Sequence, residues 1–76
     1  MEIQILGTGC PKCGKLYQNA RAAAEELGLE ADVIKVTDVN EMIALGAVMT
    51  PALAVDGEIR AAGKVPSVEK IKEMLS

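Results

Sequence analysis

The chain has 76 residues, half of them hydrophobic, and a chain of this length can build only one hydrophobic core. We therefore expect a single domain over residues 1–76. The composition contains no His, Trp or Phe, which excludes His-based catalytic triads and metal sites that need a His ligand. Eight basic and 11 acidic side chains give a formal net charge of −3, and the basic residues are scattered, which argues against nucleic acid as a partner.

Neither a membrane span nor a signal peptide is expected. The apolar runs are short, and the first four residues lack a basic region followed by a long apolar stretch. We therefore expect a cytoplasmic protein. In a reducing compartment, the close pair Cys10 and Cys13 is more typical of catalysis, redox sensing or metal binding than of a structural disulfide. A bridge between them would close too short a loop to stabilise the fold much.

The first half of the chain is expected to form a strand, a helix and a second strand. Residues 2–6 alternate in polarity, which predicts a strand with Ile3 and Ile5 on one face. A helix should follow from Pro11, with Gly28 as its C-terminal cap. Its apolar positions recur at helical spacing: Leu16, Ala20, Ala23, Ala24 and Leu27. Residues 32–37 read as a largely buried strand, parallel to the first because a helix connects them.

The second half is expected to form a helix, a hairpin and a last helix. Asp38 and Glu41 have the spacing of a capping box for a short helix that runs to about residue 45. Strands over 52–55 and 58–62 should be joined by a tight turn at 56–57, whose Asp-Gly sequence tolerates positive φ. Ser67 should cap a helix with an apolar stripe through Leu75. The β-α-β-α-β-β-α order predicts an α/β fold, a mixed four-stranded sheet flanked by three helices.

The loop before the first helix carries the chemistry. If Pro11 is the first helical residue, Cys10 is the N-cap and Cys13 lies in the first turn. The helix N-terminus, assisted by Lys12 and Lys15, should then favour the thiolate form of Cys10. Cys10 could attack a disulfide and Cys13, set further into the helix and more buried, could resolve the mixed disulfide.

A second feature is Thr50-Pro51, directly before the third expected strand. Pro51 cannot donate a ladder hydrogen bond, so it indicates a strand start or an exposed edge. Together with Cys10-Pro11-Lys12-Cys13 and the order of elements, it makes the chain resemble the thioredoxin and glutaredoxin superfamily over its whole length. The resemblance is closest to the small prokaryotic thioredoxin-like proteins called redox-active disulfide or glutaredoxin-like proteins.

The resemblance implies a protein disulfide oxidoreductase with a thioredoxin fold. It makes Cys10 the attacking thiolate, Cys13 the resolving thiol and Pro51 a cis proline, with Pro11, Lys12 and Thr50 facing the substrate. The redox-active disulfide would be the only cofactor.

The active-site loop departs from both branches of the superfamily. Gly9 stands where thioredoxins carry Trp, and Lys12 stands where glutaredoxins carry Tyr. The glutaredoxin residues that hold glutathione are not matched either, since Ala61-Ala62-Gly63-Lys64 stands in place of their Gly-Gly and following Asp. We therefore expect electrons from a thioredoxin-reductase-type partner, protein disulfides as substrates, and a monomer. Tyr17, one turn after Cys13, is either an active-site neighbour or a half-buried helix-face residue.

Two other functions use the same thiols. A soft-metal carrier could bind Cu(I) through both cysteines, although such carriers usually have Met two residues before the first Cys, where Thr8 stands here, and end in a strand. A redox sensor could instead dock a partner without turnover, and the apolar segment 47–49 (Ala47, Val48 and Met49) before Pro51 would be its docking surface.

Overall fold

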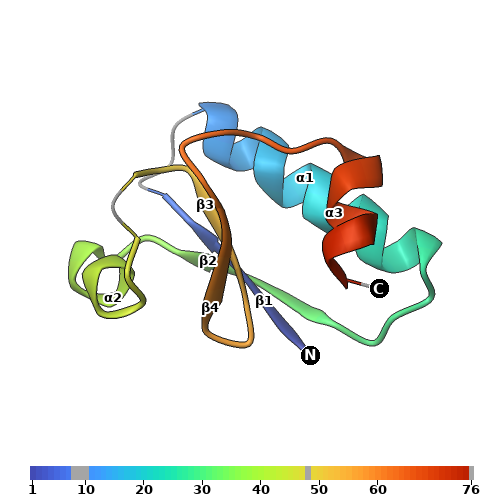
Figure 1. Ribbon diagram of the computed structural model, residues 1–76, viewed down its shortest axis with the longest axis horizontal. Coiled ribbons are helices and arrows are strands. Elements are labelled where there is room, and N and C mark those ends of the chain that lie inside the picture. The colour runs from blue at the N-terminus through green and yellow to red at the C-terminus, as the bar shows by residue number, and fades with distance from the viewer. Residues whose placement is uncertain (8–10, 48, 76) are drawn as a thin grey trace.

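The computed structural model describes residues 1–7, 11–47 and 49–75, and these form four strands and three helices (Figure 1). In chain order they are β1 (Glu2–Leu6), α1 (Pro11–Glu26), β2 (Asp32–Val36), α2 (Val39–Ala44), β3 (Ala52–Val55), β4 (Glu58–Ala62) and α3 (Val68–Leu75). Each element expected from the sequence is present in the expected order, and the expected bounds agree with the observed ones to about one residue.

The four strands form one mixed sheet in the order β2-β1-β3-β4. Strand β1 runs parallel to β2 and antiparallel to β3, and β3 pairs with β4 as an antiparallel hairpin. The hairpin turn has positive φ at both Asp56 (51°) and Gly57 (84°), the conformation that its Asp-Gly sequence favours. The predicted α/β architecture, a mixed four-stranded sheet with three helices, is therefore confirmed.

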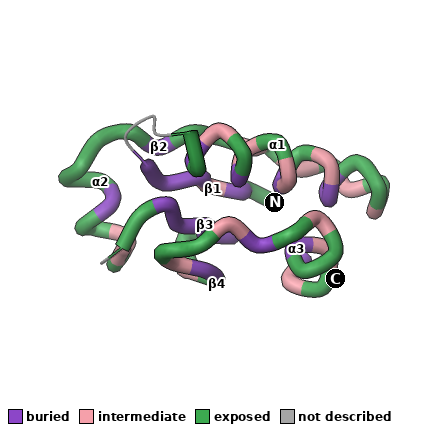
Figure 2. The backbone as a smooth tube through the Cα atoms, turned by 90° about the horizontal axis from the view of Figure 1, so that it is seen from above, coloured by how far each residue is buried: buried purple, intermediate pink, exposed green. Residues whose placement is uncertain are grey.

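Helices α1 and α3 pack side by side on one face of the sheet (Figures 1 and 2). The largest side chains of this core are fully buried: Ile3, Ile5, Leu16, Leu53 and Ile71. Two polar contacts join α1 to α3 and to the segment just before it. Asn19 Nδ2 donates to the Pro66 carbonyl at 3.0 Å, and Lys72 Nζ lies 3.3 Å from Glu26 Oε1. The helix positions predicted to be apolar and inward-facing therefore form the core of this face.

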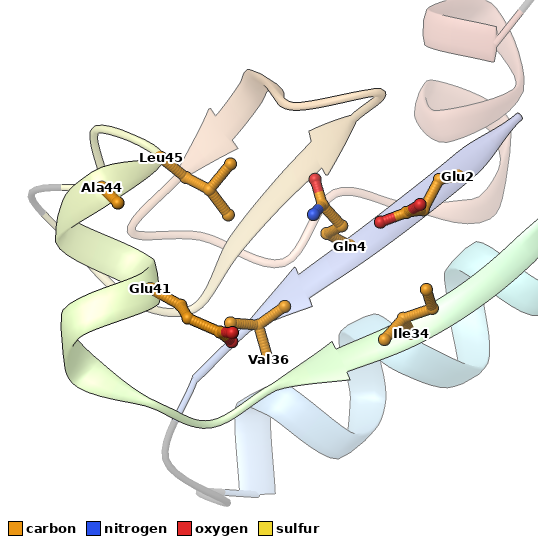
Figure 3. A pocket seen from close by; sticks show the side chains of 7 residues that line it. All are labelled: Glu2, Gln4, Ile34, Val36, Glu41, Ala44 and Leu45. Atoms are coloured by element: carbon orange, nitrogen blue, oxygen red, sulfur yellow. The ribbon is translucent and has the colours of Figure 1, made fainter.

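Helix α2 covers the opposite face of the sheet, and only part of it. Met42 packs there against Leu6 and Val36. The Asp38 side chain caps α2 by accepting from the Asn40 backbone N–H at 2.8 Å, as predicted. The other half of the predicted capping box is wrong, because no hydrogen bond joins the Glu41 side chain to the backbone of Asp38, although both residues are described. Glu41 instead turns toward Val36 (Figure 3).

The prediction that the second strand is largely buried is also wrong. In β2 only Val36 is buried, and Ile34 is 41% exposed. Two physical reasons account for this. The strand lies at an edge of the sheet, and α2, with six residues, is too short to cover its outer face. The branched apolar residues of β2 therefore reflect strand propensity more than burial.

Substitution of Leu53 should reveal how far the fold depends on the central core. Leu53 is fully buried in β3, so Leu53→Ala should lower the free energy of unfolding by about 2–5 kcal/mol, through lost apolar contact and the cavity that remains. Ile43→Ala is the matched control, because Ile43 on α2 is 65% exposed and its truncation should change stability by less than about 0.5 kcal/mol. Urea denaturation followed by circular dichroism measures both. Equal losses would contradict this description of the core.

Candidate active site

Cys13 lies in the first turn of α1, where the sequence places it. Pro11 is the first residue of the helix, as predicted, and the Cys13 side chain is buried with 7% of its surface exposed. Lys12 and Lys15 are exposed on either side of it. Cys10, the predicted attacking thiol, lies outside the described residues together with Thr8 and Gly9. The structure therefore bears on the second thiol of the motif and on the elements that hold it.

The Cys13 sulfur packs against the end of β1. Gly7 directly follows the strand and is itself buried, and its N–H donates to the Val36 carbonyl of β2 at 3.0 Å. A side chain built at Gly7 would overlap the sulfur of Cys13. The first turn of α1 is thereby held against the point where the two parallel strands end.

The peptide bond between Thr50 and Pro51 is cis, as the resemblance implied. Leu6, the last residue of β1, pairs with Ala52, the first residue of β3. Gly7 and Pro51, one residue beyond this pair on each strand, therefore lie at the same end of the sheet. Pro51 is buried and Thr50 is exposed. The fold thus brings the cis proline to the end of the sheet that also holds Cys13.

Met49 and Gly63 extend this end of the sheet toward α3. Gly63 donates its N–H to the Pro51 carbonyl at 2.9 Å and has a φ of +75°. A methyl group built at Gly63 would lie 2.9 Å from Cε of Met49, so the Met49 side chain lies directly over this glycine, and it is 60% exposed. Sequence reasoning named Met49 but not its contact with Gly63. Ala47 of the predicted docking segment is half-buried, and Val48 is outside the described residues.

The chain matches the family model described as a thioredoxin domain over residues 1–76. A thioredoxin from Methanocaldococcus jannaschii is 56% identical over 73 residues, which cover 96% of this chain and 84% of that protein. A thioredoxin from Methanothermobacter thermautotrophicus is 46% identical over 76 residues, which cover all of this chain and 99% of that protein. The chain belongs to the thioredoxin family. It is accordingly a thiol-disulfide oxidoreductase of the thioredoxin type.

Tyr17 of this thioredoxin-family protein is half-buried and packs against the core beneath α1 and α3. Two cations approach its ring. Lys35 Nζ of β2 lies 4.6 Å from the ring centroid, and Arg21 Cζ, one turn further along α1, lies 5.9 Å from it. The contact with Arg21 follows from helical spacing, whereas no local pattern indicates Lys35. Tyr17 therefore joins α1 to the exposed edge strand.

A separate hollow of about 350 Å³ lies on the face of the sheet that α2 covers only in part (Figure 3). Its lining comes from β1, β2 and α2: Glu2, Gln4, Ile34, Val36, Glu41, Ala44 and Leu45. Neither Cys13 nor Pro51 contributes to it, so it is distinct from the end of the sheet where the thioredoxin chemistry is expected.

Two further properties concern the described part of the chain. Among residues 1–7, 11–47 and 49–75, no three His, Cys, Asp or Glu side chains gather as a metal site would require. Within the same residues, no helix combines the length and the apolar character needed to cross a bilayer.

Burial of Cys13 predicts slow chemical modification of its thiol. In the Cys10→Ser variant, iodoacetamide should alkylate Cys13 at least about tenfold more slowly in the folded protein than in urea, because the reagent must await local opening. Mass spectrometry of quenched samples gives both rates. The urea-unfolded variant is the control for intrinsic reactivity. Equal rates in the two states would show that the Cys13 thiol is accessible.

Proposed function

We propose that this protein reduces disulfide bonds in other proteins, with Cys10 as the attacking thiolate and Cys13 as the resolving thiol. In the first step the Cys10 thiolate attacks one sulfur of the substrate disulfide. The bond formed is a mixed disulfide between Cys10 and the substrate, and the bond broken is the substrate disulfide. The displaced substrate sulfur leaves as a thiolate and takes up a proton.

In the second step Cys13, as its thiolate, attacks the sulfur of Cys10. A disulfide between Cys10 and Cys13 forms, the mixed disulfide breaks, and the second substrate sulfur leaves as a thiolate and is protonated. Two electrons and two protons have then passed from the Cys10/Cys13 dithiol to the substrate. The oxidised pair returns to the dithiol when a reductase supplies two electrons and the two thiolates take up two protons.

The observation that carries the proposal is the position of Cys13. Its buried sulfur sits in the first turn of α1, against the end of β1, at the end of the sheet where the cis Thr50–Pro51 bond lies. Cys10 is three residues earlier in the chain, so a thiol in this place can reach a sulfur attached to Cys10 without a second molecule. Membership in the thioredoxin family favours this function over Cu(I) transport through the same thiols.

Substrate would bind across the segment that carries Pro51. Thr50 is exposed directly before the proline, and its backbone could hydrogen-bond to an extended substrate strand. The exposed Met49 side chain supplies apolar surface beside it. Pro11 and Lys12 at the exposed start of α1 would complete the substrate-facing surface from the other side.

The electron donor in this proposal is a reductase of the thioredoxin-reductase type. The chain lacks the Gly-Gly-Asp pattern with which glutaredoxins hold glutathione, and has Ala62, Gly63 and Lys64 in that region. The redox-active disulfide is the only cofactor that the proposal requires. The reaction would take place in the cytoplasm, where the dithiol form is maintained, and would need only a monomer.

Substitution of each cysteine should block the proposed cycle at a different step. Cys10→Ser should abolish reduction of insulin disulfides, because the attacking thiolate is gone. Cys13→Ser should also block turnover, but it should accumulate a mixed disulfide through Cys10, because nothing resolves it. Mass spectrometry under non-reducing conditions detects this adduct. Full activity of Cys10→Ser would contradict the assignment of roles.

The choice of electron donor predicts little reaction with glutathione. Reduced glutathione, kept reduced by glutathione reductase, should support turnover at least about tenfold more slowly than thioredoxin reductase with NADPH, because the chain lacks the glutathione-holding pattern. Consumption of NADPH in the presence of insulin measures both rates. A glutaredoxin assayed in parallel controls for the glutathione system. Equal or faster turnover with glutathione would overturn this part of the proposal.

A further inference from the structure

Gly7, at the end of β1, lies directly against the Cys13 side chain of α1. An ideal Cβ atom at Gly7 would overlap Sγ of Cys13 and would lie 3.1 Å from its Cβ. The sulfur therefore occupies the space that a side chain at position 7 would need. Any other residue type at position 7 would compete with the thiol for this space.

Backbone conformation does not explain the glycine. The described glycines with positive φ are Gly28, Gly46, Gly57 and Gly63, and Gly7 is not one of them. Gly7 also continues the ladder between β1 and β2 through its 3.0 Å hydrogen bond to Val36, which other residue types could make as well. The feature of the structure that favours glycine at this position is therefore the space that the sulfur fills.

The sulfur cannot yield to a larger residue without leaving its position. The Cys13 side chain has a single χ1 torsion, so its sulfur has only three staggered positions to choose from. A change from one staggered well to another moves a cysteine sulfur by about 3 Å. Because Cys13 is buried, the neighbouring core must also make room for the displaced atom.

We propose that Gly7 is a positioning residue for the resolving thiol: by having no side chain, it admits the Cys13 sulfur and keeps it in the rotamer from which the mixed disulfide is resolved. This inference rests on the function proposed above, since it assigns Gly7 a role in the second step of that cycle. Gly7 itself touches no reacting group of the substrate. It acts through Cys13 alone.

The variant Gly7→Ala tests this role, with Gly14→Ala as its matched control. Both replace a glycine beside Cys13 with alanine, but a Cβ atom at Gly14 would meet nothing within 4 Å. Each reduced protein is mixed with 5,5′-dithiobis(2-nitrobenzoic acid), and the coloured thiolate is followed by stopped flow. Attack by Cys10 releases the first thiolate, and resolution by Cys13 releases the second.

In Gly7→Ala the second release should slow by at least about ten- to a hundredfold, because an error of only about 1 Å in placing a reacting group can reduce a rate about a hundredfold and a rotamer change moves the sulfur further than that. The first release should change by less than about threefold, and Gly14→Ala should match the wild type in both phases. A second release in Gly7→Ala that is within about threefold of the wild-type rate would overturn the inference. If the wild type releases only one thiolate per protein, the proposed function fails instead.

A double-mutant cycle of unfolding stability tests the inference even if Gly7→Ala folds poorly. Gly7→Ala should lower the urea midpoint of the protein with Cys13, and it should lower it much less in the Cys13→Ala background, where the sulfur is gone. An equal loss of stability in the two backgrounds would show that glycine is needed for a reason other than the sulfur, and would overturn the inference.

Discussion

Strand β1 is paired along both of its edges, and most of the structure depends on this constraint. It bonds to β2 in parallel and to β3 in antiparallel orientation. Ile3 and Ile5 enter the core under α1 and α3, while Leu6 enters the smaller core under α2. A strand fixed in this way has a defined end point. The segment that contains the two cysteines follows that point in the chain, so its origin is set by backbone hydrogen bonds on both sides of β1.

The pairing with β3 also determines where the cis proline lies. Because Leu6 pairs with Ala52, Pro51 lies at the end of the sheet where β1 ends. The hydrogen bond from Gly63 to Pro51 holds the segment that leads to α3 at the same end. Three segments far apart in the sequence therefore meet at one end of the sheet. The proposed function uses this meeting, because in it the thiols carry out the reaction while the neighbouring backbone binds a substrate strand.

Much of the fold was predictable because its signals are local. Helix α1 follows from apolar spacing and from Gly28, the hairpin turn follows from Asp56-Gly57, and the cap of α3 follows from Ser67, whose Oγ accepts the Lys70 N–H at 3.2 Å. Each of these depends on residues close in the sequence. The cis bond at Pro51 has no such signal and was predicted from the resemblance to known proteins.

What could not be predicted depends on how distant segments pack. The exposure of Ile34 results from the position of β2 at the sheet edge and from the shortness of α2, neither of which the apolar pattern of the strand contains. The approach of Lys35 to Tyr17 joins two elements 18 positions apart in the sequence. The contact between Gly7 and the Cys13 sulfur likewise appears only when the helix is placed on the sheet. Gly7 alone reads as a loop residue.

The contact between Gly7 and the Cys13 sulfur matters more because the chain has no histidine. The chain has no imidazole to act as a general base, so the proposed cycle relies on the helix start, on nearby positive charge and on the placement of the sulfurs. In the proposed cycle, burial of Cys13 limits its reaction with molecules from solution, while the short chain between the cysteines keeps it near any sulfur bonded to Cys10. Resolution within the molecule then has the advantage of a high effective concentration. That advantage depends on the direction in which the buried sulfur points, and hence on the residue packed against it.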